Sequence, residues 1–322
     1  MDASYRWNEL GRNPQVQSVC AGATLQGETI HTNAQAGTQL NLSRLRNLDW
    51  GNILWIASMH AGVLLAPFCF TWSGLGICVL LHWLTGGLGI CLCYHRLLTH
   101  RSFVVWKPIE YILTVLGGMA TQGGALTWVG THRIHHRFSD EPGDPHSPKD
   151  GHWWSHMLWV FFRASQAKGR EMWRRYVPDL FRDPIHRVLH HTHMLWTLAL
   201  GLGLYLLGGL SWLVWGLCVR TVLVYHCTWF VNWASHIWGY RNFPTRDESR
   251  NLWWVALLAY GEGWHNNHHA FQRSARHGMR WWEFDPTYWT IRVMAWIGLA
   301  RQVRLPTGGS LATDSAGPLH TT

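Results

Sequence analysis

Charged residues and paired cysteine motifs are both scarce in this sequence. Only 14% of the 322 residues are Asp, Glu, Lys or Arg, and the seven cysteines form no C-x-x-C motif. All but Cys20 lie in apolar runs, where a free cysteine behaves as a small buried hydrophobic residue. The cysteines therefore indicate neither a disulfide framework nor a thiolate zinc site.

Acidic residues are scarcer than basic ones, which leaves a formal charge of +9. A nucleic-acid-binding protein with this charge should carry a recognisable binding module, and none is found. Basic residues that face the cytoplasm and anionic lipid headgroups explain the excess better. We therefore expect no nucleic-acid partner.

A secretory signal is missing as well, because residues 1–45 contain no apolar h-region. These residues are polar, and residues 306–322 are rich in Gly, Ser, Thr and Pro. We expect both segments to be disordered tails on either side of one domain at residues 46–305.

Long apolar runs, in contrast, are abundant. Residues 52–72, 75–94, 193–215 and 216–235 are each apolar and long enough to cross a bilayer. The turns inside each pair carry no charge, whereas residues 95–192 and 236–305 are basic and should lie in the cytoplasm. The prediction is an all-α integral membrane protein with four transmembrane helices in two hairpins under a cytosolic helical cap.

Two further segments are apolar without fitting this pattern. Residues 108–128 are rich in glycine, and we expect a shallow or re-entrant helix there, because another crossing would place the histidine motifs on opposite sides. Residues 279–305 mix tryptophan with arginine, which favours an interfacial amphipathic helix. Packing of this segment against the soluble part is the alternative.

Histidine is the residue type that carries chemistry here, with 22 copies. Three motifs stand out: H-x-x-x-x-H at His95 and His100, and two H-x-x-H-H boxes, at His132, His135 and His136 and at His265, His268 and His269. Positions i, i+3 and i+4 share one helix face, so each box is expected to point three imidazoles at one spot. Eight imidazoles supply two metals with four ligands each, and nitrogen ligands suit iron, copper, zinc or nickel.

Such a nitrogen-rich pair of metals favours O₂ activation on an apolar substrate drawn from the bilayer. A hydroxylase on the same scaffold and a non-catalytic metal- or haem-binding membrane protein are the alternatives. We expect the other histidines to serve packing or hydrogen bonding: His60, His82, His146, His152, His156, His186, His190, His191, His193, His226 and His277.

The motifs HRLLTH, HRIHHRFSD and GEGWHNNHHAF resemble those of the membrane fatty-acyl desaturases, in the stearoyl-type delta-9 group. The segments DPHSPKDGHWWSHM, HCTWFVNWASHIWGY and SARHGMRWWEFD are similar to those of bacterial and cyanobacterial acyl-lipid desaturases, and the likeness covers residues 50–305. The resemblance implies two Fe²⁺ ions, O₂ as co-substrate and a cis double bond near carbon 9 of a saturated 16–18-carbon acyl chain. It also implies an integral protein of a bacterial plasma membrane or thylakoid membrane, with its site on the cytoplasmic side.

Further site residues follow from the same resemblance. His236 matches a ninth ligand, and Asn232 matches a residue that reaches a metal through water. Gln122, Trp128 and Thr228 match the residues at the bend of the substrate tunnel, and Trp83 with Gly87 matches its closed far end. Carboxylates that orient the ligand imidazoles are also expected, and the candidates are Glu262, Asp140 and Asp144.

One departure concerns the substrate carrier. Acyl-CoA desaturases of animals carry Arg-Asp before the first H-x-x-H-H box, where this sequence has Gly130-Thr131. The difference favours an acyl chain esterified to a glycerolipid, with acyl-CoA as the alternative. No fused cytochrome b5 module is recognised, so we expect a ferredoxin-like electron donor, or else a separate cytochrome b5, on the basic segment from Arg163 to Arg187.

Overall fold

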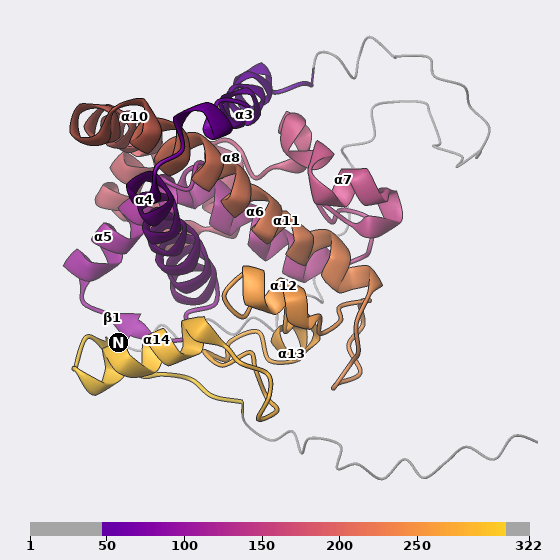
Figure 1. Cartoon of the computed structure of the whole chain (residues 1–322). Helices are drawn as coiled ribbons and strands as arrows, with labels where there is room; N and C mark the ends of the chain where they lie inside the picture. Colours follow the sequence, from indigo (N-terminus) through magenta and orange to yellow (C-terminus); the bar gives the residue numbers. More distant parts are fainter. Residues whose placement is uncertain (1–46, 307–322) are drawn as a thin grey trace, which may run out of the picture. The chain divides into compact units, whose positions relative to one another are not determined.

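The computed structural model describes residues 47–306, and these residues are mostly helical (Figure 1). The strands of the described part are β1 (Val104–Val105) and β2 (Ala300–Arg301), which pair antiparallel. The tails expected over 1–45 and 306–322 lie outside the described residues, apart from residue 306.

The first helical hairpin begins at α3 (Trp50–Val63), where the side chain of Asp49 caps the N-terminus by accepting the Asn52 N–H. A short turn, η2 (Ala66–Cys69), leads to α4 (Trp72–His82), which continues without a break into η3 (Trp83–Thr99). Residues Trp72–Thr99 form a helix that is long and apolar enough to cross a membrane.

The second hairpin consists of α10 (Pro184–Leu213), η7 (Val214–Val219) and α11 (Arg220–Ile237). Together they form a helical segment of 54 residues that is also apolar enough to cross a membrane. The backbone breaks at Gly209 (φ 62°), and Leu204 then packs against Gly216, so the chain turns back on itself. Helix α10 begins before the predicted residue 193 because Asp183 caps its first turn and Pro184 fits the N1 position.

Helix α5 (Lys107–Gly118) has 12 residues and is about 18 Å long, too short for a hydrocarbon core of about 30 Å. It lies against η3, where a Cβ on Gly89 would come within 2.6 Å of the α5 backbone. The shallow or re-entrant helix expected at 108–128 stays a prediction, because α3, which we expect to cross the membrane, has only 14 residues and is also shorter than such a core. The next helix, α6 (Ala125–Phe138), starts after a turn at residues 119–124.

Short elements complete the cap: η4 (Pro148–Asp150), α7 (His152–His156), η5 (Leu158–Phe161), η6 (Arg163–Ser165), α8 (Arg170–Tyr176), α9 (Pro178–Arg182), α12 (Trp253–Leu258), α13 (His265–Ala270) and α14 (Pro286–Trp296). Figure 1 shows α12, α13 and α14 gathered near one end of α4 and α11. Helix α14 buries Tyr288 and Ile291 and exposes Trp289, Val293 and Trp296. The buried face agrees with the expected packing against the rest of the protein, and the exposed apolar face is compatible with an interfacial helix.

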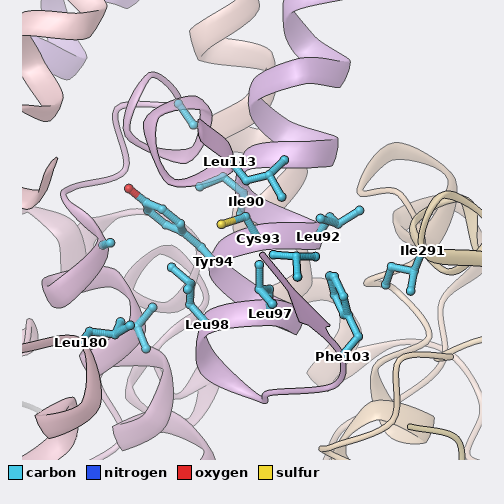
Figure 2. Packing of buried hydrophobic residues seen from close by; sticks show 14 of the residues in the cluster. Ile90, Leu92, Cys93, Tyr94, Leu97, Leu98, Phe103, Leu113, Leu180 and Ile291 are labelled. Carbon is cyan, nitrogen blue, oxygen red and sulfur yellow. The ribbon is translucent and has the colours of Figure 1, made fainter. Parts of the chain in front are cut away.

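The largest core cluster forms around η3, as Figure 2 shows. Its members come from η3, α5, α6, α8, α9, α11, α14, both strands and adjoining loops, and include Ile90, Leu92, Cys93, Tyr94, Leu97, Leu98, Phe103, Leu113, Leu180 and Ile291. Among the described cysteines, Cys78, Cys91, Cys93, Cys218 and Cys227 are free and buried, as predicted, whereas Cys69 is free but only half-buried. The core therefore holds the C-terminal half of η3, which ends at the first histidine motif, in a fixed place.

Candidate metal centre

The first histidine motif lies on a wide helical turn. Most of η3 has π-type geometry, and the N–H of His100 donates to the carbonyl of His95 at 3.2 Å, five residues back. Such i→i+5 bonds widen the turn, which brings residues five apart to the same side of the helix, and the two imidazole centroids are 4.8 Å apart. The spacing of H-x-x-x-x-H thus fits a π-helix, in which both rings point the same way.

The two H-x-x-H-H boxes do not point three imidazoles at one spot, so that prediction is wrong. His132 and His136 of α6 join one cluster, and His135 joins another. The reason is angular. Positions i and i+4 differ by about 40° around a helix, whereas i+3 and i+4 differ by about 100°. A box therefore offers an i, i+4 pair to one site and its middle histidine to the other.

The second H-x-x-H-H box, on α13, divides in the opposite sense. His265 and His269 join the second cluster, and His268 joins the first. Two glycines put this short helix in place: Gly261 has φ 102°, and a Cβ on Gly263 would come within 2.1 Å of the α12 backbone. Neither position accepts a side chain without moving the box.

Nine histidines therefore form two groups whose ligand atoms lie within 4.8 Å of one another inside each group. The first contains five: His95, His100, His132, His136 and His268. The second contains four: His135, His236, His265 and His269. All nine are the histidines singled out from the sequence. Asn232 lies one turn before His236 on α11 and lines the adjoining cavity.

The Nε2 atoms have the spacing that a shared cation requires. The Nε2 atoms of His268 and His136 are 2.9 Å apart, those of His95 and His268 3.1 Å, and those of His265 and His236 3.0 Å. Two nitrogens at right angles around a metal, each at about 2.1 Å, are about 3.0 Å apart. In addition, the buried Nε2 atoms of His100, His135 and His269 have no hydrogen-bond partner among the described residues. The residues therefore fit two metal ions with imidazole ligands.

Carboxylates face the opposite nitrogens of four of these rings. The Nδ1 atom of His95 lies 2.7 Å from Glu262 Oε2, that of His135 3.0 Å from Asp144 Oδ1, and that of His236 2.9 Å from Asp140 Oδ2. This arrangement agrees with the expectation for Glu262, Asp140 and Asp144. It keeps the proton on Nδ1 and leaves Nε2 free to bind a metal.

Sequence reasoning missed the fourth carboxylate. Asp247 Oδ2 lies 2.6 Å from His269 Nδ1, across a loop 22 residues away in the chain. Its position after the last apolar run was the only signal, because no spacing relates Asp247 to a histidine motif.

Burial keeps most of these imidazoles neutral, which is the form that binds metals. Burial, followed by repulsion from neighbouring imidazoles, places the pKa of His100, His132, His136, His265 and His268 well below the ordinary value. Burial also lowers the pKa of His269 to about 4, against the opposing effect of Asp247. For His135 the carboxylate of Asp144 outweighs burial and raises the pKa.

Glu262 links the metal centre to the rest of the cap. Arg96 is fully buried and donates from Nε to Glu262 Oε1 (3.1 Å) and from Nη1 to Asp285 Oδ2 (2.9 Å). Burial alone would raise the pKa of Glu262. The charge of Arg96 and two neighbouring histidines outweigh burial and hold this pKa well below its usual range. One of these histidines, His277, lies with Nδ1 3.0 Å from Glu262 Oε2, in the hydrogen-bonding role that we expected.

An apolar cavity of about 110 Å³ lies beside the clusters. His95, His132 and His265 line it, together with Gln122, Trp128 and Thr228 from the predicted tunnel bend. Those last three residues form a hydrogen-bonded chain: Trp128 Nε1 donates to Gln122 Oε1 (3.1 Å), and Gln122 Nε2 donates to Thr228 Oγ1 (2.7 Å).

Trp83 and Gly87 do not line this cavity. They line a second, much smaller one together with Tyr260 and the start of α14. The sequence placed all five tunnel residues along one path, whereas the structure brings three together and puts two at a separate hollow.

Two other polar clusters lie outside the metal centre. His226 contacts His60 and His156 through different ring nitrogens (3.1 and 3.0 Å), so these three rings do not converge on one point. Glu110, Asp183 and His186 also come together, but the ammonium of Lys107 already lies between the two carboxylates (2.7 and 3.1 Å). These arrangements agree with the hydrogen-bonding roles expected for His60, His156, His186 and His226.

Comparisons with known proteins indicate the function of this centre. Residues 70–297, more than half of the chain, match the family described as fatty acid desaturase. The chain belongs to the fatty acid desaturase family. It is therefore an oxidoreductase of the desaturase type.

Characterised relatives are similar over most of their length. The sn-1 stearoyl-lipid 9-desaturase of Anabaena variabilis is 48% identical over 80% of this chain and 94% of the relative. The sn-2 palmitoyl-lipid 9-desaturase of Nostoc sp. is 47% identical over 80% and 90% of the two chains. A chloroplastic palmitoyl-monogalactosyldiacylglycerol delta-7 desaturase of Arabidopsis thaliana is 47% identical over 81% and 70%.

Proposed function

We propose that this desaturase is an O₂-dependent di-iron enzyme that introduces a cis double bond near carbon 9 of a saturated acyl chain esterified to a glycerolipid. The observation that carries the proposal is the pair of imidazole clusters beside an apolar cavity whose wall contains the Gln122–Trp128–Thr228 chain. The names of the Anabaena and Nostoc relatives support stearoyl or palmitoyl chains on a lipid as substrate.

Two iron ions, when bound, supply the capacity to activate O₂ and to remove two hydrogens from adjacent methylenes. The five-histidine cluster would hold one ion and the four-histidine cluster the other, and Asn232, which lines the cavity one turn before His236, would act through water. Glu262, Asp144, Asp140 and Asp247 hold protons on Nδ1 of their histidines, so that Nε2 stays free for the metal.

The cavity walls have two tasks in this proposal. Trp128, Ile90 and Cys91 present apolar surface to a hydrocarbon chain and keep bulk water from the clusters. The amide of Gln122 forms hydrogen bonds with both Trp128 and Thr228. These bonds would fix the position of the bend in the cavity relative to His95 and His132. This fixed bend would select the carbon pair that faces the metals.

The packing at Gly130 supports a lipid carrier over coenzyme A. A Cβ at Gly130 would come within 2.9 Å of the Ala167 Cβ, and Thr131 Oγ1 accepts the Ala167 N–H at 3.0 Å. The loop at Ala167 thus fills the space where acyl-CoA desaturases of animals carry an arginine. An arginine here would have to displace that loop.

We further propose that the two hairpins cross the membrane four times with the cap on the cytoplasmic side. Thr71 and Ser211 join the two hairpin turns through their hydroxyl groups (2.7 Å), and both turns lie at the opposite end of the hairpins from the histidines. The exposed tryptophans of α14 fit a helix that lies in the interface beside the crossings.

Desaturation by O₂ releases both oxygen atoms as water, which requires two electrons and two protons beyond those of the substrate. A separate ferredoxin-like protein, or alternatively a cytochrome b5, would supply the electrons. Exposed basic residues on the cap offer a docking surface for such an acidic partner: Arg163, Lys168, Arg170, Arg174, Arg175, Arg182 and Arg187.

Expression in a host that lacks unsaturated acyl chains tests the proposal. Lipids are extracted, and mass spectrometry locates any double bond and its glycerol position. We expect monounsaturated lipid with the bond near carbon 9, and the His268→Ala variant should form none although it still reaches the membrane.

Other products would point to other functions. Alcohols in place of alkenes would indicate a hydroxylase, and desaturation of free acyl-CoA before lipid would contradict the lipid carrier. Unchanged saturated lipids from an iron-loaded, reduced enzyme would refute the activity. A Soret band in the purified protein would indicate a haem protein.

A further inference from the structure

Arg220 is a fully buried arginine inside the second apolar helical segment. Ionisable side chains in membrane segments are costly and are retained mostly where they have a task. No carboxylate within the described residues lies at ion-pair distance from Arg220, and its Nη2 has no hydrogen-bond partner among them. Arg220 is a member of neither histidine cluster.

The guanidinium group of Arg220 instead contacts backbone and hydroxyl oxygens. Nε donates to the carbonyl of Gly216 (3.0 Å), and Nη1 donates to the carbonyl of Met119 (2.8 Å) and to Thr85 Oγ1 (3.3 Å). Met119 is the C-terminal cap of α5, where the helix carbonyls carry partial negative charge. Arg220 therefore ties three helical elements together at the end of α5.

The turn that follows Met119 is the non-helical link between α5 and α6, and backbone of this kind at membrane depth needs protein partners. Thr121 (φ 57°) and Gly123 (φ 98°) adopt left-handed conformations in it. Helix α11 supplies the partners: the hydroxyl of Tyr225 lies 2.6 Å from Thr121 Oγ1 and donates to the Thr121 carbonyl at 2.9 Å.

Gln122 belongs to the same turn, and its amide donates to Thr228 of α11. Arg220, Tyr225 and Thr228 thus contact Met119, Thr121 and Gln122 of this turn, respectively. Tyr225 and Thr228 lie five and eight residues after Arg220 on α11. The turn carries Thr121 and Gln122 into the wall of the cavity beside the clusters.

We propose that Arg220 is a positioning residue for regioselectivity. By its hydrogen bond to the Met119 carbonyl, Arg220 sets the position of the turn between α5 and α6. The position of this turn determines where Gln122 bends the acyl chain relative to the metal clusters. This inference rests on the proposed function. A misplacement of about 1 Å is enough to change the outcome at a reacting centre, so loosening this anchor should let a neighbouring carbon pair reach the metals.

Lysine cannot replace the arginine fully, because its single ammonium group lacks the fork that reaches Gly216 and Met119 together. Arg220→Met removes both contacts and keeps an apolar stem. Arg220→Lys keeps the charge and one contact. Arg292→Met, which removes an exposed arginine of α14, is the control.

The experiment uses the full-length enzyme in membranes, with saturated lipid as substrate. It measures the ratio of double-bond positional isomers and the iron per chain. We expect the wild type and Arg292→Met to form one main isomer, with the same small proportion of a second. Arg220→Met should retain iron and raise the ratio of a second isomer about tenfold, equivalent to about 1.4 kcal/mol between two barriers. Arg220→Lys should lie between them.

An unchanged isomer ratio in iron-loaded Arg220→Met would overturn the inference and leave the activity standing. If Arg220→Met does not accumulate, Arg220→Lys decides: lower thermal stability with an unchanged isomer ratio shows a purely structural role. Absence of any alkene from the wild type would instead refute the proposed function.

Discussion

Replacing Asp247 by asparagine should weaken metal binding at the second cluster, because it reverses the hydrogen bond that sets the tautomer of His269. Asp247 Oδ2 faces His269 Nδ1 at 2.6 Å, while Oδ1 accepts from the Ser249 N–H at 3.1 Å and from the Thr245 hydroxyl at 3.0 Å. An asparagine that keeps its carbonyl oxygen toward Ser249 and Thr245 turns its NH₂ group toward His269. The His269 proton must then move to Nε2, the nitrogen that faces the cluster.

The size of the effect follows from the role of such carboxylates. Losing one that orients a metal-binding imidazole typically lowers affinity 10–100-fold, which is about 1.4–2.7 kcal/mol. We expect the upper end of this range, because the contact is short and the substitution favours the wrong tautomer. Burial raises the pKa of Asp247, but its hydrogen bonds to His269 and Ser249 hold the pKa well below its usual range, so the carboxylate is ionised at neutral pH.

The assay is iron per chain during titration with a chelator, measured on purified protein in detergent. Asp247→Asn should lose one iron at 10–100-fold lower chelator concentration, while the second iron, in the five-histidine cluster, leaves as in the wild type. Glu248→Gln is the control, because that neighbouring side chain is 54% exposed. Equal retention of both irons by Asp247→Asn and Glu248→Gln would refute the reasoning, and loss of both irons would show that the clusters are not independent.

Three further perturbations probe the packing and the protonation of the site. Gly89→Ala should destabilise the fold by about 1–3 kcal/mol, because its Cβ would come within 2.6 Å of the α5 backbone, whereas Gly76→Ala meets nothing within 4 Å and should not; thermal unfolding in detergent compares them, and equal melting temperatures would contradict the packing. Lowering the pH from about 7 to about 5.5 should release iron from the four-histidine cluster first, because Asp144 raises the pKa of its ligand His135, whereas burial lowers the pKa of His100, His132, His136 and His268 in the other cluster; iron content after dialysis at each pH checks this, and equal retention of both irons at about pH 5.5 would contradict it. Gly130→Arg should lower both the melting temperature and the rate of lipid desaturation, because the arginine side chain must displace the loop at Ala167. A melting temperature and a rate equal to those of the wild type would contradict this packing argument.

Much of the fold could be predicted because its signals are local. The apolar runs and the uncharged turns were enough to predict helical hairpins, and the helical segments Trp72–Thr99 and Pro184–Ile237 coincide with three of the four runs. Helix boundaries were less certain, since Asp183 and Pro184 start α10 well before its apolar part. The break at Gly209 depends on the backbone of one residue, which composition does not reveal.

The candidate site was predictable in its ligands but not in their division. Eight histidines follow from motif spacing, and His236 follows from the resemblance to the desaturases. The division of each box between two clusters depends on how α6 and α13 are oriented toward each other, which no spacing within a box determines. The same holds for Trp83 and Gly87, which the structure separates from the bend residues.

The sequence by itself determined which side chains are available: imidazoles at helical spacing, apolar segments of membrane length, and a basic cap. Those properties reside in neighbouring residues, where covalent geometry and helical periodicity dictate the outcome. Only the tertiary structure decided that Asp247 faces His269 and that Arg220 holds the carbonyl of Met119, 101 residues away. Contacts of that kind arise when distant segments pack together, and the free energy that selects them depends on the whole fold.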